Sequence, residues 1–271
     1  VLDQGFGGVL PGPGPRPMAW RQLRAARGSL PLAVPAVRVS ALGDPALMAE
    51  AGLCSTLAGE VEAAVAAVTG AVELATALGC RSVVLEPGVV VWPEDPGPVD
   101  LAQEEGWGKD GAPARLLRRE ARMERALDVA CRTFHRLTGS FPDIEFCLTP
   151  SRHLGGLGEA RALELIFEDL ARGRLRYWHD TAAVACRQAR LGEAPGEFLE
   201  KFANRLVGMT LGDIGDGQVY LPPGTGGVDY PLLSSYRRRS AKALTAVVEL
   251  DPGVTPGELP GIHAFLNKFG L

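Results

Sequence analysis

The segment Leu206–Leu233 constrains the fold more than any other part of this chain. It opens with the apolar run Leu206–Leu211, which has the length of a buried strand. The sequence then turns polar at Asp213, passes through a Gly- and Pro-rich loop at Leu221–Gly227, and starts a helix near Tyr230. A buried strand that delivers an acid to a glycine-rich loop and then a helix is the repeating unit of an α/β barrel. In that architecture the loops after the strands line the active-site mouth.

Short apolar runs and helical segments alternate along the rest of the chain. The expected strands are the end of Val1–Leu10, then Leu32–Val39, Ser82–Leu85, Ile144–Leu148, Leu175–His179, Leu206–Leu211 and Leu244–Val248. The expected helices are Met18–Arg27, Leu57–Leu78, Arg115–Leu137, Ala160–Ala171, Phe198–Phe202, a helical stretch that starts near Tyr230 and includes Tyr236–Ala243, and Ile262–Lys268. Such alternation implies parallel strands with crossover helices. It predicts a (β/α)8 TIM barrel that takes up residues 1–271 as one domain.

Only seven strands are visible, and a closed barrel of this kind needs eight. We expect either that the first strand precedes Val1 or that the barrel is open at one seam. An open seam would expose strand edges that must be covered or paired. Together with the long loop described below, it would also favour a homodimer.

Composition excludes several classes of protein. A net charge of −4 lacks the basic footprint of a nucleic-acid surface. No apolar run reaches membrane-spanning length, and the first residues show no signal peptide. The five cysteines are scattered, odd in number and without a Cys-x-x-Cys pair, which predicts reduced thiols in the cytoplasm.

Three carboxylates follow expected strands directly. Glu86, Asp180 and Glu249 each come at the end of an apolar run. Because the carboxyl ends of parallel strands meet at one rim, we expect these side chains to point into the mouth as the polar core of a catalytic site. The alternative for Asp180 and Glu249 is a structural hydrogen-bond network. For Glu86 it is a salt bridge to an arginine such as Arg152.

Two loops carry further candidates. Arg152 and His153 follow the strand that ends near Thr149, and they either bind substrate or form an ordinary structural loop. His179 precedes Asp180, so strand alternation should turn it toward the helix layer. The loop at Pro222–Gly227 either cradles a phosphate or serves as a turn before the next helix.

The loop Val89–Ala112 is unusually long and contains Trp107. Loops of this length are uncommon unless they are functional or disordered. It follows a strand and should therefore lie on the mouth side. We expect either a lid that contacts the substrate through Trp107 or a mobile surface insertion.

Six motifs occur in the order and spacing of one known family. They are Val83–Gly88 (VVLEPG), Phe146–Pro150 (FCLTP), Trp178–Val184 (WHDTAAV), Met209–Asp213 (MTLGD), Leu221–Asp229 (LPPGTGGVD) and Val247–Leu250 (VVEL). Over essentially its whole length the chain resembles the xylose-isomerase-like TIM barrels, which include sugar phosphate isomerases and epimerases and endonuclease IV. Gly5–Leu10 (GFGGVL) is similar to the family's second strand.

The resemblance implies a divalent metal ion (Mn, Mg, Co or Zn) held by Glu, Asp, His and Glu at four strand ends. The corresponding positions here are Thr149, Asp180, Thr210 and Glu249, so two ligands remain, Asp180 and Glu249. Two neutral hydroxyls replace a carboxylate and an imidazole, which should remove most of the metal affinity. The family's substrate-contacting His falls at Ala183.

The resemblance therefore implies a sugar isomerase or epimerase that acts on or binds a small sugar, polyol or sugar phosphate, with its metal site partly lost. The expected substrate contacts are Thr149, Arg152, His153, Thr210, Asp213 and Trp107. The alternative is a catalytically degenerate barrel that binds a metabolite or a partner. DNA repair is disfavoured, because the three-metal site of endonuclease IV needs many histidines and this chain has four.

Overall fold

The computed structural model describes residues 5–11, 25, 28–29, 33–39, 51–90, 99–102, 111–171, 175–239 and 244–271. Within 111–171, the side chains are described from residue 116 onward. Nearly all of the helix expected at Met18–Arg27, and Trp107 in the long loop, lie outside these residues. All five cysteines are free thiols, as predicted. No helix in the described ranges is both long and apolar enough to cross a bilayer.

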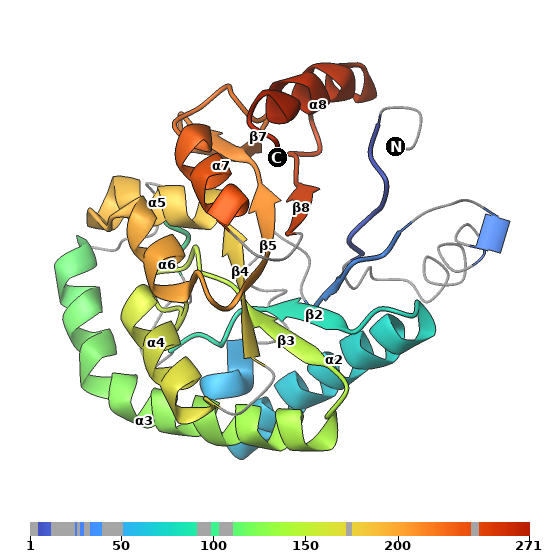
Figure 1. Cartoon of the computed structure of the whole chain (residues 1–271). Helices are drawn as coiled ribbons and strands as arrows, with labels where there is room; N and C mark the ends of the chain where they lie inside the picture. Colours follow the sequence, from blue (N-terminus) through green and yellow to red (C-terminus); the bar gives the residue numbers. More distant parts are fainter. Residues whose placement is uncertain are drawn as a thin grey trace.

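Six parallel strands form one curled sheet in the order β1-β2-β3-β4-β5-β8 (Figure 1). The strands are β1 (Val37–Arg38), β2 (Ser82–Leu85), β3 (Glu145–Leu148), β4 (Leu175–Asp180), β5 (Leu206–Leu211) and β8 (Thr245–Val248). All six overlap runs that the sequence predicts as strands, and β4 extends one residue further than predicted, to Asp180. A separate antiparallel hairpin, β6 (Asp213–Gly215) and β7 (Gln218–Leu221), follows β5 and was not predicted.

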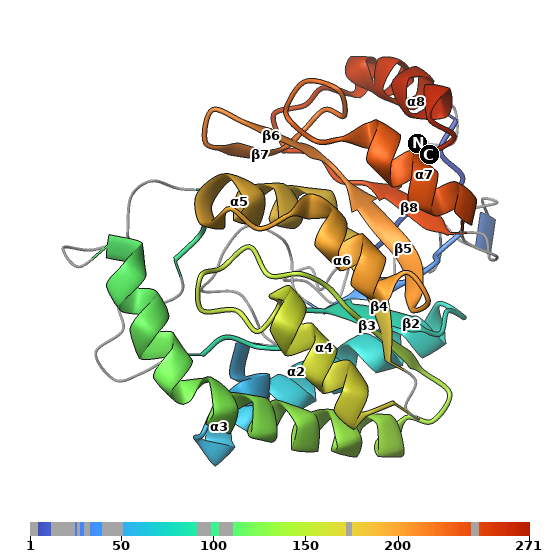
Figure 2. The same cartoon turned by 60° about the vertical axis from the view of Figure 1, so that its left-hand side comes forward.

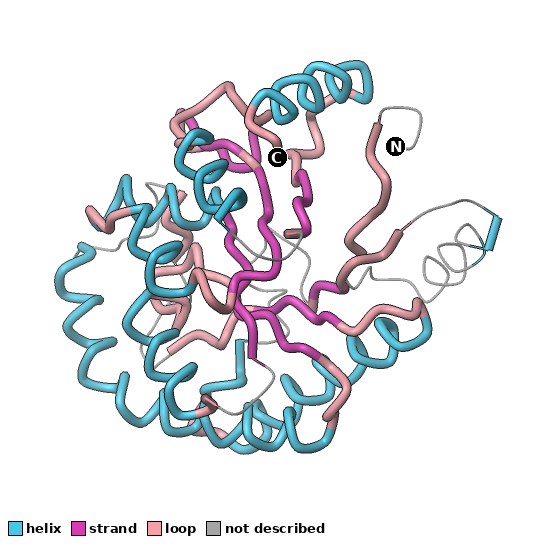
Figure 3. Tube along the Cα trace, in the orientation of Figure 1, coloured by secondary structure: helices cyan, strands magenta, loops and turns pink. Residues whose placement is uncertain are grey.

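The strands lie at the centre of the molecule, and helices cover the outer face of the curled sheet (Figures 2 and 3). They are α2 (Ala58–Ala77), α3 (Gly111–Ser140), α4 (Ala160–Asp169), α5 (Thr181–Leu191), α6 (Pro195–Phe202), α7 (Tyr230–Arg239) and α8 (Leu259–Lys268). Two short 3₁₀ turns, Ala51–Cys54 and Pro256–Glu258, complete the described elements. The main hydrophobic core lies between sheet and helices. This arrangement is the predicted TIM-barrel fold.

The strand expected at the end of Val1–Leu10 is present as a single parallel bridge between Gly8 and Ala33. Val9 N donates to Ala33 O at 2.9 Å, and a Cβ on Gly8 would lie 2.4 Å from that oxygen. Phe6 packs edge-on against His263 of α8, with 5.6 Å between ring centroids. The N-terminal segment therefore lies between β1 and the last helix, beside the end of the sheet that β1 forms.

The inner face of the sheet carries a small apolar layer. Ala36, Val84, Cys147 and Trp178 form one buried cluster there. The indole of Trp178 fills this space because the neighbouring strand has glycine at Gly208, whose Cβ would lie 2.3 Å from the ring. This apolar layer fills part of the inner face below the mouth, so we expect a ligand to bind above it.

Candidate functional site

A ring of polar residues lies directly above the apolar inner layer. Strand side chains alternate between the two faces, so the residue two positions after an inward apolar residue also points inward. The ring consists of Arg38, Glu86, Thr149, Asp180, Thr210 and Glu249, each two positions after Ala36, Val84, Cys147, Trp178, Gly208 and Val247, respectively. The predicted carboxylates therefore meet at one rim, and an arginine that the sequence analysis did not select lies among them.

Arg38 joins two of the three predicted carboxylates. Its Nη2 lies 3.5 Å from Asp180 Oδ2, and its Nη1 lies 3.5 Å from Glu249 Oε2. The Arg38 side chain is only 6% exposed. Burial by itself lowers the pKa of Arg38, but Glu249, Tyr220, Asp180 and Glu86 together raise it above its ordinary value. Arg38 is therefore a fixed positive charge.

Asp180 is held in one orientation by contacts on both of its oxygens. Oδ1 accepts from the backbone N–H of Ala183 at 3.0 Å and thereby caps α5, which starts at the next residue. Oδ2 accepts from the Tyr220 hydroxyl at 3.2 Å and faces Arg38. Asp180 is 1% exposed, so its carboxylate is part of a rigid buried network.

Glu249 is the carboxylate of the ring that solvent reaches most easily, with 23% of its side chain exposed. Partial burial raises the pKa of Glu249 to about 7, against the opposing effect of Arg38 and with a further increase from Asp180. A carboxyl group with such a pKa can take up and release a proton near neutral pH.

Tyr220 is a site residue that sequence reasoning missed. It lies on β7 with a φ of 59°, a left-handed conformation that aromatic residues rarely adopt. Its buried ring lies beneath the guanidinium of Arg152, 5.6 Å from Cζ to centroid. Gly212 makes room for it, since a Cβ there would lie 2.9 Å from Tyr220 Cδ1. Strain of this kind persists where the surroundings fix it, often at functional sites.

The loop after β3 forms one wall of the mouth. Arg152 is fixed by Asp100 of the long loop, through Nε to Oδ1 at 2.8 Å and Nη2 to Oδ2 at 2.7 Å. Backbone bonds Leu101 N to Arg152 O and Leu154 N to Val99 O hold the two loops together. Residues 99–102 thus lie on the mouth side, as predicted for the long loop.

Several buried polar atoms in this wall have no hydrogen-bond partner within the described part of the chain. They are Thr149 Oγ1, Arg152 Nη1, and both ring nitrogens of His153. His153 is 5% exposed, and its Nδ1 approaches Glu86 Oε2 at 3.8 Å, beyond hydrogen-bond length. Burial raises the pKa of Glu86, but His153, Ser151 and Arg38 outweigh this and keep it below its usual value.

Two predicted substrate contacts have other partners. Thr210 Oγ1 accepts from Trp178 Nε1 at 2.9 Å. Asp213 is 0% exposed, and its carboxylate accepts from the backbone N–H groups of Ile214, Gly224 and Val228. Asp213 is thus the anion that shapes the loop expected to cradle a phosphate.

The residues at the four metal positions do not fit a divalent cation. Asp180 and Glu249 both face the guanidinium of Arg38, which carries the positive charge of this position. The other two positions offer neutral hydroxyls, and that of Thr210 already accepts a hydrogen bond. Nowhere in the described ranges do three or more His, Cys, Asp or Glu side chains gather as a metal site.

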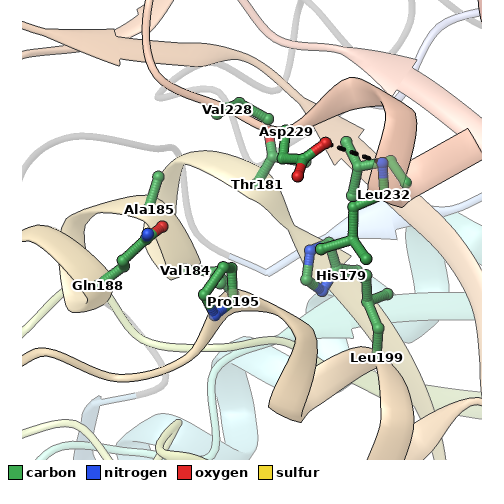
Figure 4. Close-up of a pocket in the computed structure, with 11 residues that line it drawn as sticks. His179, Thr181, Val184, Ala185, Gln188, Pro195, Leu199, Val228, Asp229 and Leu232 are labelled. Carbon is green, nitrogen blue, oxygen red and sulfur yellow. Dashed lines mark hydrogen bonds between the residues drawn. The ribbon is translucent and has the colours of Figure 1, made fainter.

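His179 faces the helix layer, as strand alternation predicts. It lines a small pocket between α5, α6 and the start of α7, together with Val184, Leu199 and Asp229 (Figure 4). Its Nδ1 hydrogen-bonds the Tyr177 hydroxyl at 2.8 Å. Burial lowers the pKa of His179 to about 3. The imidazole is neutral in the folded protein.

Acid should therefore destabilise the protein partly through His179. Below pH 6.5, the unfolded-state pKa, the imidazole of His179 is protonated in the unfolded chain, whereas in the folded protein it stays neutral until the pH falls to about 3. The free energy of unfolding therefore decreases as the pH falls through this interval. Between pH 8 and pH 5 the loss is about 2 kcal/mol. We expect His179→Asn, which keeps an acceptor for Tyr177, to remove that part of the pH dependence in urea unfolding. The surface variant His135→Asn should retain it, and equal curves for wild type and His179→Asn would contradict the assignment.

Comparison with solved structures defines the class of fold. The chain has the TIM-barrel fold of its solved neighbours. No protein-family model matches the sequence, and no curated protein is significantly similar to it.

Three neighbours illustrate the similarity. A 3-keto-D-glucoside 4-epimerase from E. coli is 11% identical with a TM-score of 0.69, over 99% of this chain and 91% of the other. A D-tagatose 3-epimerase-like protein is 17% identical with a TM-score of 0.67, over 94% and 83%. A putative xylose isomerase from Rhodospirillum rubrum is 13% identical with a TM-score of 0.71, over 98% and 89%. At these identities the likeness establishes the fold alone.

Proposed function

We propose that this protein binds a small sugar, polyol or sugar phosphate above the polar ring and acts on it as an isomerase or epimerase. The observation that carries the proposal is the set of buried polar atoms on Thr149, Arg152 and His153 that have no hydrogen-bond partner among the described residues. A buried polar atom without a partner costs about 1–3 kcal/mol. A polyhydroxylated ligand offers donors and acceptors to all three side chains. The fold neighbours named as sugar epimerases and isomerases add support.

Glu249 is the proposed acid–base group, because its carboxylate is partly exposed at the mouth. It takes the proton from the carbon beside the ligand's carbonyl group. The C–H electron pair forms a C=C bond, and the carbonyl π pair moves to oxygen, which gives an enediolate. Return of the proton to the former carbonyl carbon, with transfer of the neighbouring hydroxyl proton to the enediolate oxygen, completes isomerisation. Epimerisation instead needs a second group on the opposite face of the original carbon, which donates a proton there while Glu249 keeps the one that it removed.

The charges of the mouth favour an uncharged ligand over a phosphate ester. Glu86, Asp180 and Glu249 share the single guanidinium of Arg38, and Arg152 is already neutralised by Asp100. In the loop 222–227, the backbone N–H of Gly224 is bound to the carboxylate of Asp213. A phosphate dianion would therefore meet surplus negative charge and a loop that already holds its own anion.

The test is deuterium incorporation in D₂O, followed by NMR, with neutral aldoses and ketoses and with their phosphate esters. We expect deuterium at the carbon beside the carbonyl group of a neutral sugar, and at least tenfold slower exchange with the esters. The position of the label distinguishes isomerisation from epimerisation. Absence of both binding and exchange across the whole panel would refute the carbohydrate proposal, and faster exchange with esters would refute the charge argument.

One observation favours the second candidate, a catalytically degenerate barrel that binds a metabolite without turnover. Asp180 and Glu249 both face the guanidinium of Arg38, which offsets one of their two negative charges. This candidate predicts measurable sugar binding by calorimetry with no deuterium exchange. It also predicts that Glu249→Gln leaves the affinity unchanged.

A further inference from the structure

We propose that Arg38 is a resident cation of this site: its guanidinium takes the place of a divalent metal ion between Asp180 and Glu249 and presents its positive charge to a ligand oxygen. The part of this inference that concerns the ligand rests on the proposed function. The part that concerns the metal does not, since it follows from the side chains alone.

The first support is position. Arg38 lies on β1 and Glu249 follows β8, and these strands form the two ends of the sheet order. Only the curl of the sheet brings them together across the mouth. Two different nitrogens of the same guanidinium face Asp180 and Glu249 at 3.5 Å each. The guanidinium therefore bridges the two carboxylates that the resemblance assigns to a metal ion.

The second support is charge balance. Asp180 and Arg38 are 1% and 6% exposed at their side chains, and buried charges are retained in proteins only when they are paired. The pKa of Arg38 is raised even though burial by itself lowers it, because Glu249, Asp180 and Glu86 all favour its charged form. The chain itself thus supplies a positive charge that offsets part of the negative charge of the ring acids.

The third support is that the charge is anchored to the barrel wall. Arg38 N donates to Pro11 O at 2.9 Å, and the next residue, Val39, donates to Val84 O at 2.9 Å. Both ion-pair distances exceed the 2.7–3.2 Å range usual for a hydrogen bond, so a ligand oxygen can compete for the guanidinium. A fixed positive charge that faces a developing oxyanion stabilises it without reorganisation.

The experiment compares wild type with Arg38→Met, which removes the charge at similar length, and Arg38→Lys, which keeps it. Mn²⁺ binding is measured by electron paramagnetic resonance, and Tm is measured with and without Mn²⁺. Arg187→Met is the matched control, because Arg187 is a buried arginine paired with Glu193 outside the ring. None of these readouts uses a carbohydrate, so failure of the proposed function would not affect them.

For wild type and Arg38→Lys we expect no stoichiometric Mn²⁺ binding. Arg38→Met should lose about 10 °C in Tm, bind Mn²⁺ at least about tenfold more tightly than wild type, and regain much of the lost Tm in its presence. Adding Glu249→Gln to Arg38→Met should abolish both the binding and the recovery. Arg187→Met should lose Tm without recovery.

Two outcomes would overturn the inference. One is a stoichiometric Mn²⁺ site in the wild type that Asp180→Asn abolishes, because the metal and the guanidinium would then coexist. The other is an Arg38→Met variant that has the same Tm as wild type and, like wild type, does not bind Mn²⁺. Should Arg38→Met fail to fold, its refolding yield with and without Mn²⁺ gives the same decision, since only an uncovered carboxylate pair makes that yield depend on Mn²⁺.

Discussion

Replacing Glu249 with glutamine is expected to lower the rate of deuterium exchange at the ligand by about 10²–10⁴-fold, the usual contribution of a general acid–base group. Glutamine has nearly the same shape but cannot accept a proton from carbon. Ligand affinity, measured by calorimetry, should change only a few-fold, because Arg152 and His153 keep their positions. The exchange rate and the affinity should therefore separate in this variant.

Glu145→Gln is the matched control for that experiment. Glu145 is also paired with an arginine, Arg176, at 3.1 Å, but it is the first residue of β3 and lies at the end of the strand away from the mouth. We expect its exchange rate to equal that of wild type. A Glu249→Gln variant that exchanged at the wild-type rate would show that another group carries the proton.

Replacing Asp213 with alanine is expected to lower the free energy of unfolding by about 3 kcal/mol or more. Its carboxylate accepts backbone N–H groups from Ile214, Gly224 and Val228, at 3.1, 2.9 and 2.9 Å. Without it, three partly buried donors lose a charged acceptor, and a hydrogen bond to a charged group contributes about 1.5–3 kcal/mol. Urea unfolding of the variant and of wild type gives the difference directly.

Asp229→Ala provides the comparison. Asp229 Oδ1 accepts a single N–H, that of Leu232, at the start of α7. Loss of such a helix cap costs about 1 kcal/mol. Equal losses for the two variants would mean that the bonds to Asp213 do not hold the loop, and the argument that this loop is closed to a phosphate would fail with it.

Most strands could be predicted because their signal is local. Apolar runs bounded by turns gave β2 and β5 with the boundaries that the structure has. The helix α5 was missed because Asp180 serves two elements at once. It ends β4 and caps the helix that begins at the next residue, with no loop between them to mark a boundary.

The hairpin β6–β7 was missed although its turn carries a recognisable signal. Asp216 and Gly217 both have positive φ, at 50° and 75°, as a tight Asp-Gly hairpin turn requires. The polar residues around this pair hid it within what reads as one long loop. Tyr220, which reaches the mouth only because the hairpin folds back, was missed with it.

The sequence by itself determined that a polar side chain points inward at the carboxyl end of each strand. Each of these polar residues lies two positions after an inward-facing residue, and residues two positions apart on a strand point to the same face. That spacing is enough to predict Glu86, Asp180 and Glu249 at one rim. It also places Arg38 there, two residues after Ala36. Only the tertiary structure decided that Arg38 is shared between Asp180 and Glu249. Arg38 lies on β1, Asp180 ends β4 and Glu249 follows β8, and no two of these strands are neighbours in the sheet. Their contact depends on how far the sheet curls, which no local pattern encodes.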